Sequence, residues 1–227
     1  MGKSLFVVGT GTDIGKTYVT GLIIKKLREN GKSSAYFKAA MSGNERDKNG
    51  ELIPGDSVEV KNISGISQPI EEMSPYIYEK AVSPHLAAKL EGNPLNLENV
   101  YKKFKRIYDK YDYITIEGAG GILCPMRFDD EEIWLSDIIR LCKSGCIMVA
   151  DAGLGTINSA GLTAFYMKEK GIPLKGIILN RFEPGNTMHE DNLKMCEYIT
   201  GAKVIACVKE GDSDLDISFE NLESVYY

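Results

Sequence analysis

The sequence predicts an α/β fold in which a mainly parallel sheet is flanked by helices on both faces. Short apolar, β-prone runs alternate with longer stretches whose apolar residues recur at helical spacing. Strands that alternate with helices form right-handed crossovers, which make the sheet parallel. The first apolar run also leads through a glycine-rich turn directly into a helical stretch. No repeat or domain boundary is visible, so residues 1–227 are predicted to form a single domain.

Six segments are predicted as strands. Residues 5–8 are a short apolar run that ends in glycines, which is typical of a buried parallel strand. The other five segments share this apolar, β-prone character, and they are 34–39, 113–117, 146–151, 177–180 and 204–208. The last of them is the least regular.

Helical patterns lie between the predicted strands. Residues 16–30 place their apolar side chains on one face, and Gly31 follows as a stop signal. The other helical patterns cover 83–91, 97–110, 133–143, 159–169 and 188–199. The polar stretch 41–75 is long for a connection, so it is either a functional loop or contains a short helix.

The composition argues against several classes of protein. The net charge is −5, which disfavours a general nucleic-acid or anionic-membrane binder. No apolar run approaches the roughly 18 residues that span a bilayer. The first residues lack the features of a signal peptide or a myristoylation site. The five cysteines show no metal-binding spacing, which predicts reduced thiols in a cytoplasmic protein.

The most specific signal is the segment GTGTDIGKT at residues 9–17, between the first strand and the first helix. Its glycines allow backbone N–H groups to turn toward phosphate oxygens at a helix N-terminus. We expect Lys16 to reach the terminal phosphates and Thr17 to ligate Mg²⁺. Thr10 stands where the usual G-x4-GK[ST] pattern has glycine, but the flanking strand and helix favour a phosphate loop over an accidental turn. The segment predicts a three-layer P-loop fold.

Polar residues at other strand ends are candidates for the same site, because ligands of such sheets bind beyond the carboxyl ends of the strands. Glu117 ends an apolar strand and precedes glycines, which suits a metal ligand. Asp56 is either a second metal ligand or a helix N-cap. Lys38 is either a snorkelling surface residue or a second cation that faces the transferred phosphate.

Taken together, these segments resemble the dethiobiotin synthetase family. The resemblance spans about residues 4–182. It rests on the phosphate loop, KAAMSG at 38–43, Asp56, SPH at 83–85, EGAGG at 117–121 and GLGTIN at 153–158. The longer phosphate loop is a trait of that family. Single motifs occur in other ATPases, whereas the full set is specific.

The resemblance implies an ATP-dependent ligase of biotin biosynthesis that converts 7,8-diaminononanoate, CO₂ and MgATP into dethiobiotin, ADP and phosphate. The diamine first captures CO₂ as a carbamate, and the carbamate oxygen attacks the γ-phosphorus. The second amine then attacks the carbamic-phosphoric anhydride, closes the ureido ring and expels phosphate. Catalysis of phosphoryl transfer depends mainly on positioning and countercharge.

The resemblance also implies which residues act in this reaction. The expected catalytic residues are Lys38, Lys16 and Thr12, and the expected Mg²⁺ ligands are Thr17, Asp56 and Glu117. The residues expected to bind ATP are Asp13, Ile14, Gly15, Lys16, Thr17, Tyr18, Asp56, Glu117, Gly118, Ala119, Gly120, Asn180 and Arg181. Among these, Asn180 takes the position of the adenine reader.

Substrate binding is expected to involve two subunits. The residues expected to bind the diamine or carbamate are Thr12, Lys38, Ser42, Thr156, Ile157 and Asn158. The turn at 155–159 offers free N–H groups to the substrate carboxylate. In the family this helix end comes from the partner, so the resemblance implies a homodimer with a shared active site. An ordinary helix cap is the alternative interpretation.

The likeness fades beyond Arg181. The family often has a proline after its last strand, but residues 206–211 contain none. Asn192 stands about where some relatives have a substrate-facing tyrosine, and His85 on its own is typical of a structural cap. The main alternative is a partitioning-type nucleotide-switch ATPase. Such ATPases carry a signature lysine in the phosphate loop, where this chain has Gly11.

Overall fold

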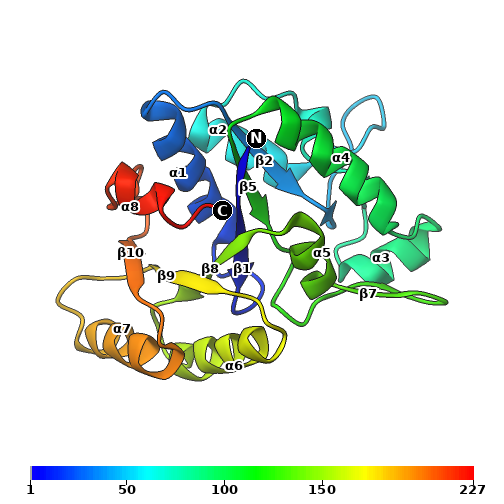
Figure 1. Cartoon of the computed structure of the whole chain (residues 1–227). Coiled ribbons are helices and arrows are strands. Elements are labelled where there is room, and N and C mark those ends of the chain that lie inside the picture. The colour runs from blue at the N-terminus through cyan, green and yellow to red at the C-terminus, as the bar shows by residue number, and fades with distance from the viewer. Residues whose placement is uncertain (1) are drawn as a thin grey trace.

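A parallel six-stranded sheet forms the centre of the computed structural model, which describes residues 2–227 (Figure 1). The strand order is β10-β9-β8-β1-β5-β2. The strands are β1 (Lys3–Gly9), β2 (Ser34–Lys38), β5 (Tyr113–Glu117), β8 (Gly145–Asp151), β9 (Leu174–Asn180) and β10 (Val204–Val208). Every neighbouring pair in this sheet is parallel, which confirms the predicted fold class.

Alternation along the strands creates two apolar faces. In β1, Phe6 and Val8 belong to one core cluster, and Leu5 and Val7 belong to the other. The first face is covered by α4 (Leu97–Lys110), α5 (Leu135–Cys142), α6 (Thr156–Glu169) and α7 (Thr187–Thr200). The second is covered by α1 (Lys16–Glu29) and α8 (Phe219–Glu223), and α2 (Gly55–Ser64) packs against α1. Figure 1 shows α8 and α6 on opposite sides of β9.

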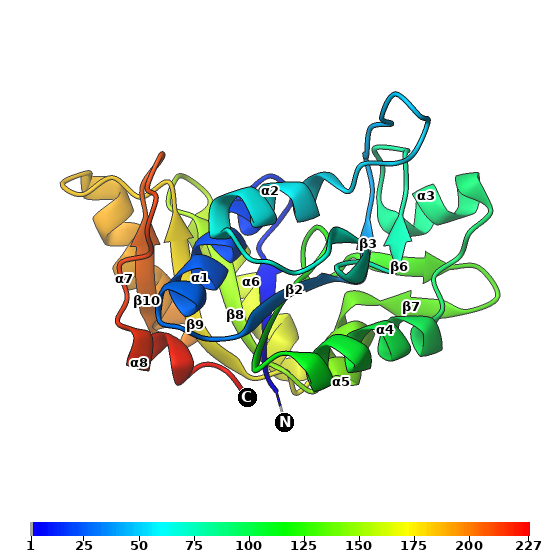
Figure 2. The ribbon, with the colours of Figure 1, turned by 90° about the horizontal axis from the view of Figure 1, so that it is seen from above.

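A small flank extends the molecule beyond β2 (Figure 2). It contains β3 (Ala40–Met41), β4 (Tyr76–Ile77), the antiparallel hairpin β6 (Pro125–Phe128) and β7 (Glu132–Trp134), and α3 (Pro84–Glu91). A single 3₁₀ turn, η1 (Ile70–Glu72), precedes β4. Of the two expectations for 41–75, the short helix is therefore confirmed, because α2 lies within it.

The predicted bounds differ from the structure in ways that have local causes. The helix expected from 133 begins at Leu135, because Ile133 is buried in the hairpin. The helix expected from 159 begins at Thr156, directly after Gly155 at φ 90°. The hairpin and α8 were not predicted, because their strands and helix are too short to show periodicity. No helix in residues 2–227 is long and apolar enough to cross a bilayer.

The register of the sheet determines which residues meet at its rim. Lys38 at the end of β2 pairs with Glu117 at the end of β5, and Glu117 in turn pairs with Val7 of β1. The phosphate loop starts two residues later, after Gly9. The predicted cation, the predicted carboxylate and the loop therefore share one edge of the sheet.

Candidate active site

The phosphate loop ends at an open helix N-terminus. Gly15 caps α1 with φ 85°, a left-handed conformation that favours glycine, and no side chain caps the helix. A Cβ at Gly15 would lie 2.1 Å from Nδ2 of Asn180, so the close approach also requires glycine. The first turn carries no acidic residue. Its free N–H groups and the helix dipole therefore favour an anion.

Lys16 lies across this loop. Its ammonium donates a hydrogen bond to the carbonyl oxygen of Gly11 at 2.8 Å, and the side chain is buried. Burial and the positive charge of Lys38 lower the pKa of Lys16 to about 8. Because Lys16 has no ion-pair partner among the described residues, an anion in the pocket would stabilise its charged form.

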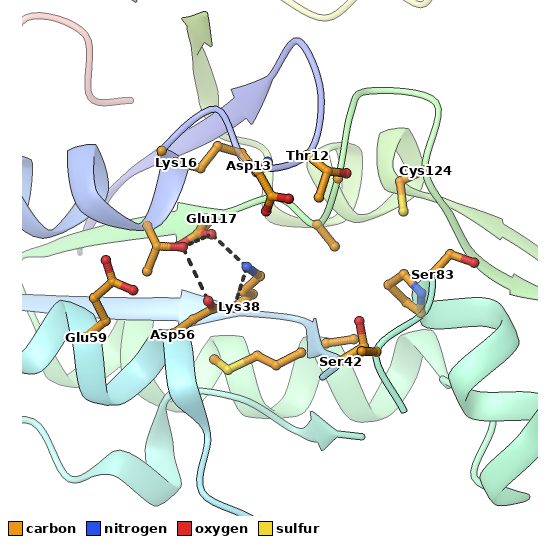
Figure 3. Close-up of a pocket in the computed structure, with 18 of the residues that line it drawn as sticks. Thr12, Asp13, Lys16, Lys38, Ser42, Asp56, Glu59, Ser83, Glu117 and Cys124 are labelled. Atoms are coloured by element: carbon orange, nitrogen blue, oxygen red, sulfur yellow. Dashed lines mark hydrogen bonds and ion pairs between the residues drawn. The ribbon is translucent and has the colours of Figure 1, made fainter. Parts of the chain in front are cut away.

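Lys38 lies between two carboxylates (Figure 3). Its Nζ is 2.7 Å from Oδ2 of Asp56 and 2.7 Å from Oε1 of Glu117. Burial alone would lower the pKa of Lys38, but the two carboxylates outweigh burial and raise it above its ordinary value. Lys38 is therefore a buried, charged residue of the site, and the alternative of a snorkelling surface lysine is wrong.

The hydroxyls of Thr17 and Tyr36 complete this cluster. Thr17 donates to Oε1 of Glu117 at 2.9 Å and lies 3.3 Å from Oδ1 of Asp56. Tyr36 donates to Oε2 of Glu117 at 2.8 Å. Burial and the negative charge of Glu117 raise the pKa of Tyr36 well above its usual range, so the phenol keeps the proton that it donates.

The three predicted metal ligands lie together. The oxygens of Thr17, Asp56 and Glu117 converge, and an all-oxygen set of this kind suits Mg²⁺. Asp56 is not the N-cap of α2: that position is Pro54, and the carboxylate of Asp56 faces Lys38. Among residues 2–227, no group of three His, Cys, Asp or Glu side chains forms a metal site by protein ligands alone. A metal here would therefore need the hydroxyl and the nucleotide.

A cavity of about 810 Å³ opens in front of the cluster. Its walls include most of the residues that the sequence predicted for catalysis and phosphate binding, namely Thr12, Asp13, Gly15, Lys16, Thr17, Tyr18, Lys38, Ser42, Asp56, Glu117, Ala119, Gly120 and Arg181. Gly118 lies behind the wall, where a Cβ would be 3.0 Å from Leu135. The cavity therefore gathers charged groups from α1, β2, β5 and α2 around one volume.

On the side of the cavity where adenine is predicted to bind, the side chains of Asn180 and Arg181 bond to the phosphate loop. The side-chain amide of Asn180 donates to the carbonyl oxygen of Ile14 at 2.9 Å, which ties β9 to the phosphate loop. Arg181 bonds to Asp151 at 2.6 Å and to the carbonyl of Asp13 at 2.8 Å. These contacts brace the loop from the β9 side.

Three predicted substrate residues lie away from the cavity. Thr156, Ile157 and Asn158 form the first turn of α6, and none of them lines it. Asn192 is buried and donates to the carbonyl oxygens of Ala152 and Gly153 at 2.8 and 3.0 Å. Asn192 therefore holds this turn from inside.

His85 does not cap α3. Ser83 is the N-cap residue, and Nδ1 of His85 is buried without a hydrogen-bond partner. The five cysteines are free, as expected.

Sequence reasoning missed three residues near the cluster. Tyr36 lies two positions before Lys38 in β2, so strand alternation could have placed both on one face. Glu59 lies one turn after Asp56 and lines the cavity, which a predicted helix α2 would have indicated. Burial raises the pKa of Cys124, another wall residue, to about 11. No sequence signal pointed to Cys124.

Comparison with known proteins finds relatives that match this chain over its whole length. A family model described as an AAA domain matches residues 3–213. A Clostridium botulinum (strain Langeland) protein named ATP-dependent dethiobiotin synthetase BioD is 47% identical over 226 residues, covering 100% of this chain and 99% of that protein. A protein of the same name from Brachyspira hyodysenteriae is 44% identical over 227 residues, covering both chains in full.

Solved structures with the same fold are more distant. A chain of the MinC:MinD cell division protein complex from Aquifex aeolicus has a TM-score of 0.58 at 14% identity, covering 92% of this chain and 81% of that chain. A ParA family ATPase from Chlorobium tepidum has a TM-score of 0.55 at 16% identity, covering 99% and 90%. These likenesses show the P-loop ATPase fold alone.

Proposed function

The chain belongs to the family of ATP-dependent dethiobiotin synthetases, and from that premise we propose which of its residues carry out the ligation. One observation supports the assignment above all: Lys16, Lys38 and the pair Asp56 and Glu117 reach one cavity from four different elements. An anionic carbamate must approach an anionic phosphate, so the site has to supply concentrated positive charge.

ATP binds with its phosphates at the N-terminus of α1. The loop amides and Lys16 neutralise the β- and γ-phosphates. The side-chain nitrogen of Asn180 donates to the carbonyl oxygen of Ile14 in the loop. The side-chain oxygen of Asn180 is therefore free to accept a hydrogen bond from the amino group of the adenine. The contacts of Arg181 keep the loop in place while the nucleotide binds.

Thr17, Asp56 and Glu117 hold Mg²⁺ in this proposal. The donor set is all oxygen and includes two carboxylates, which fits the metal. When bound, Mg²⁺ supplies positive charge against the phosphate oxygens. Tyr36 fixes the orientation of Glu117 from behind through its hydrogen bond.

Lys38 and the polar wall act on the reacting atoms. One amine of the diamine attacks CO₂ and loses a proton, which gives a carbamate that Thr12 and Ser42 orient. The carbamate oxygen attacks the γ-phosphorus and ADP leaves, while Lys38 stabilises the charge that spreads over the equatorial oxygens. The second amine attacks the carbamate carbon and loses a proton, and phosphate leaves with the transferred oxygen, which closes the ureido ring.

A second copy of the chain completes the substrate site. The first turn of α6 is open, and Thr156 is buried there with a hydroxyl whose one hydrogen-bonding neighbour among the described residues is the thiol of Cys196. Around it, the turn before α6, α6 itself and α7 expose large apolar side chains, namely Leu154, Leu162, Phe165, Tyr198 and Ile199. A patch of this size is typical of an interface. We place the substrate carboxylate at this turn of the partner subunit.

Labelled bicarbonate tests the whole assignment. With MgATP and 7,8-diaminononanoate, the label is expected in a ureido product, and ATP turnover is expected to require the diamine. If the rate of ATP hydrolysis does not depend on the diamine and no labelled product forms, the assignment is contradicted and a nucleotide-switch ATPase is favoured.

A further inference from the structure

Lys38 already binds one oxygen of each carboxylate on which the proposed metal site depends. Its Nζ lies 2.7 Å from one carboxylate oxygen of Asp56 and 2.7 Å from one of Glu117. Oε1 of Glu117 also accepts from Thr17, the third proposed ligand. The Lys38 side chain is 9% exposed and that of Glu117 is 1% exposed, so little water screens this ion pair.

Two cations cannot share these oxygens without strong repulsion. An ammonium and a divalent ion bound to the same two carboxylates, of which Glu117 is buried and Asp56 is partly exposed, would lie a few ångströms apart and repel each other. Conversely, removing the ammonium without replacement would leave two carboxylates facing each other, one of them fully buried. One cation therefore has to leave as the other arrives.

We infer that Lys38 is a placeholder cation: its ammonium neutralises Asp56 and Glu117 in the nucleotide-free enzyme and prevents a divalent metal from binding there alone. When metal and nucleotide enter together, Lys38 leaves the carboxylates for the phosphate oxygens. The inference rests on the metal ligands assigned under the proposed function and adds an order of binding to them.

The surroundings of Lys38 allow this exchange. Its ammonium lines the same cavity as Lys16, so the phosphates that Lys16 binds are within the volume that Lys38 faces. The four-carbon stem of a lysine is flexible, and its compact charge transfers readily between anions. In Figure 3 the ammonium points from the end of β2 into the space between Asp56 and Glu117, toward the phosphate loop.

Lys16 provides a matched control. It carries the same charge and lines the same cavity, but it bonds to the carbonyl of Gly11 and to neither carboxylate. A general loss of positive charge would act similarly in Lys16→Met and Lys38→Met. Displacement from the carboxylates would act only in Lys38→Met.

Metal binding without nucleotide tests the inference. Mn²⁺ is titrated into wild type, Lys38→Met, Lys38→Arg and Lys16→Met, and free Mn²⁺ is followed by electron paramagnetic resonance. Lys38→Met is expected to bind Mn²⁺ at least about tenfold more tightly than wild type, and the other two variants within about threefold of it. An affinity of Lys38→Met no higher than that of Lys16→Met would overturn the inference.

A second measurement uses the wild-type protein, in case Lys38→Met does not fold. The ammonium NMR signal of Lys38, assigned by its absence in Lys38→Arg, is expected to shift on addition of Mg²⁺ with ADP and to stay in place with Mg²⁺ alone at the same concentration. A shift caused by Mg²⁺ alone would overturn the inference.

The same titrations separate the inference from the metal assignment. If Glu117→Gln with ADP binds Mn²⁺ as tightly as wild type with ADP, the proposed metal ligands are wrong. If Glu117→Gln loses binding but Lys38→Met gains none, the ligands stand and the placeholder role fails.

Discussion

Two helices of this protein begin in the same way but face different surroundings. α1 follows β1, α6 follows the neighbouring strand β8, and each starts after a left-handed glycine with no side-chain cap. Gly15 has φ 85° and Gly155 has φ 90°. The α1 terminus opens into a cavity with two lysines, whereas the α6 terminus lies outside it, next to Leu154, which is 95% exposed.

From this difference we propose that the residues around an open helix terminus determine what it binds. Both termini offer free N–H groups, which favour any anion. Near the α1 terminus, the ends of β2 and β5 place Lys38 beside Glu117. This pair of charges suits a nucleotide that binds together with its metal. At α6 the surroundings are an apolar surface, which would suit the methylene chain of the substrate in the proposed dimer.

Removing either lysine at the α1 terminus is expected to have the largest effect. Lys16→Ala or Lys38→Ala removes countercharge from the transferred phosphate and is expected to lower kcat at least about a hundredfold. Steady-state ATP turnover with saturating diamine measures it. Near-wild-type turnover by either folded variant would contradict the roles assigned here.

Alanine at the two cap glycines compares the termini directly. Both variants carry the strain of a left-handed alanine, about 1–2 kcal/mol. Gly15→Ala also drives a Cβ into Asn180, whereas a Cβ at Gly155 meets nothing within 4 Å. We expect Gly15→Ala to weaken ATP binding at least about tenfold and Gly155→Ala to change it less than about threefold. Calorimetric titration with ATP checks this, and equal losses would show that the Asn180 contact is unimportant.

A charge on the apolar surface tests whether the α6 terminus needs a partner. Phe165 is 65% exposed on α6, so Phe165→Glu is not expected to unfold the chain. We expect a monomer by sedimentation and about a tenfold rise in KM for the diamine. Tyr101→Glu on α4 is the matched control, since Tyr101 is also exposed but lies away from α6 and α7. Full activity in a monomeric Phe165→Glu would exclude a shared site.

Thr156→Val is the mildest change and the most local. It removes a buried hydroxyl whose one hydrogen-bonding neighbour is the weakly polar thiol of Cys196, so thermal stability is expected to change little. If the hydroxyl serves the substrate carboxylate, KM for the diamine is expected to rise about fivefold with KM for ATP unchanged. An unchanged KM for both substrates would remove Thr156 from the proposed site.

Much of the fold could be predicted from the sequence, because the central strands are short apolar runs and the long helices are periodic. The expected 113–117 and 97–110 agree with β5 and α4 residue by residue. The flank could not be predicted in this way. In β6 and β7 the strands are four and three residues long, and their pairing depends on contacts with α3 that no local pattern encodes.

The site also contains some features that local sequence predicts and others that depend on tertiary contacts. The phosphate loop was readable because its chemistry is local, and Glu117 stood out as a charge at the end of an apolar strand. The ion pairs of Lys38 with Asp56 and Glu117 were not readable, because they depend on register across β2 and β5 and on the position of α2. Asn192, which stands about where some relatives have a substrate-facing tyrosine, is buried and bonds to the turn before α6, and no local pattern indicated that contact.

The contact between Gly15 and Asn180 has a consequence for how such enzymes diverge. Because the backbone of one position and the side chain of the other fill the same small space, neither can drift independently. A lineage that enlarges residue 180 to accommodate another base must reshape the phosphate loop at the same time. If Asn180 reads the base as proposed, base preference and phosphate affinity are expected to change together.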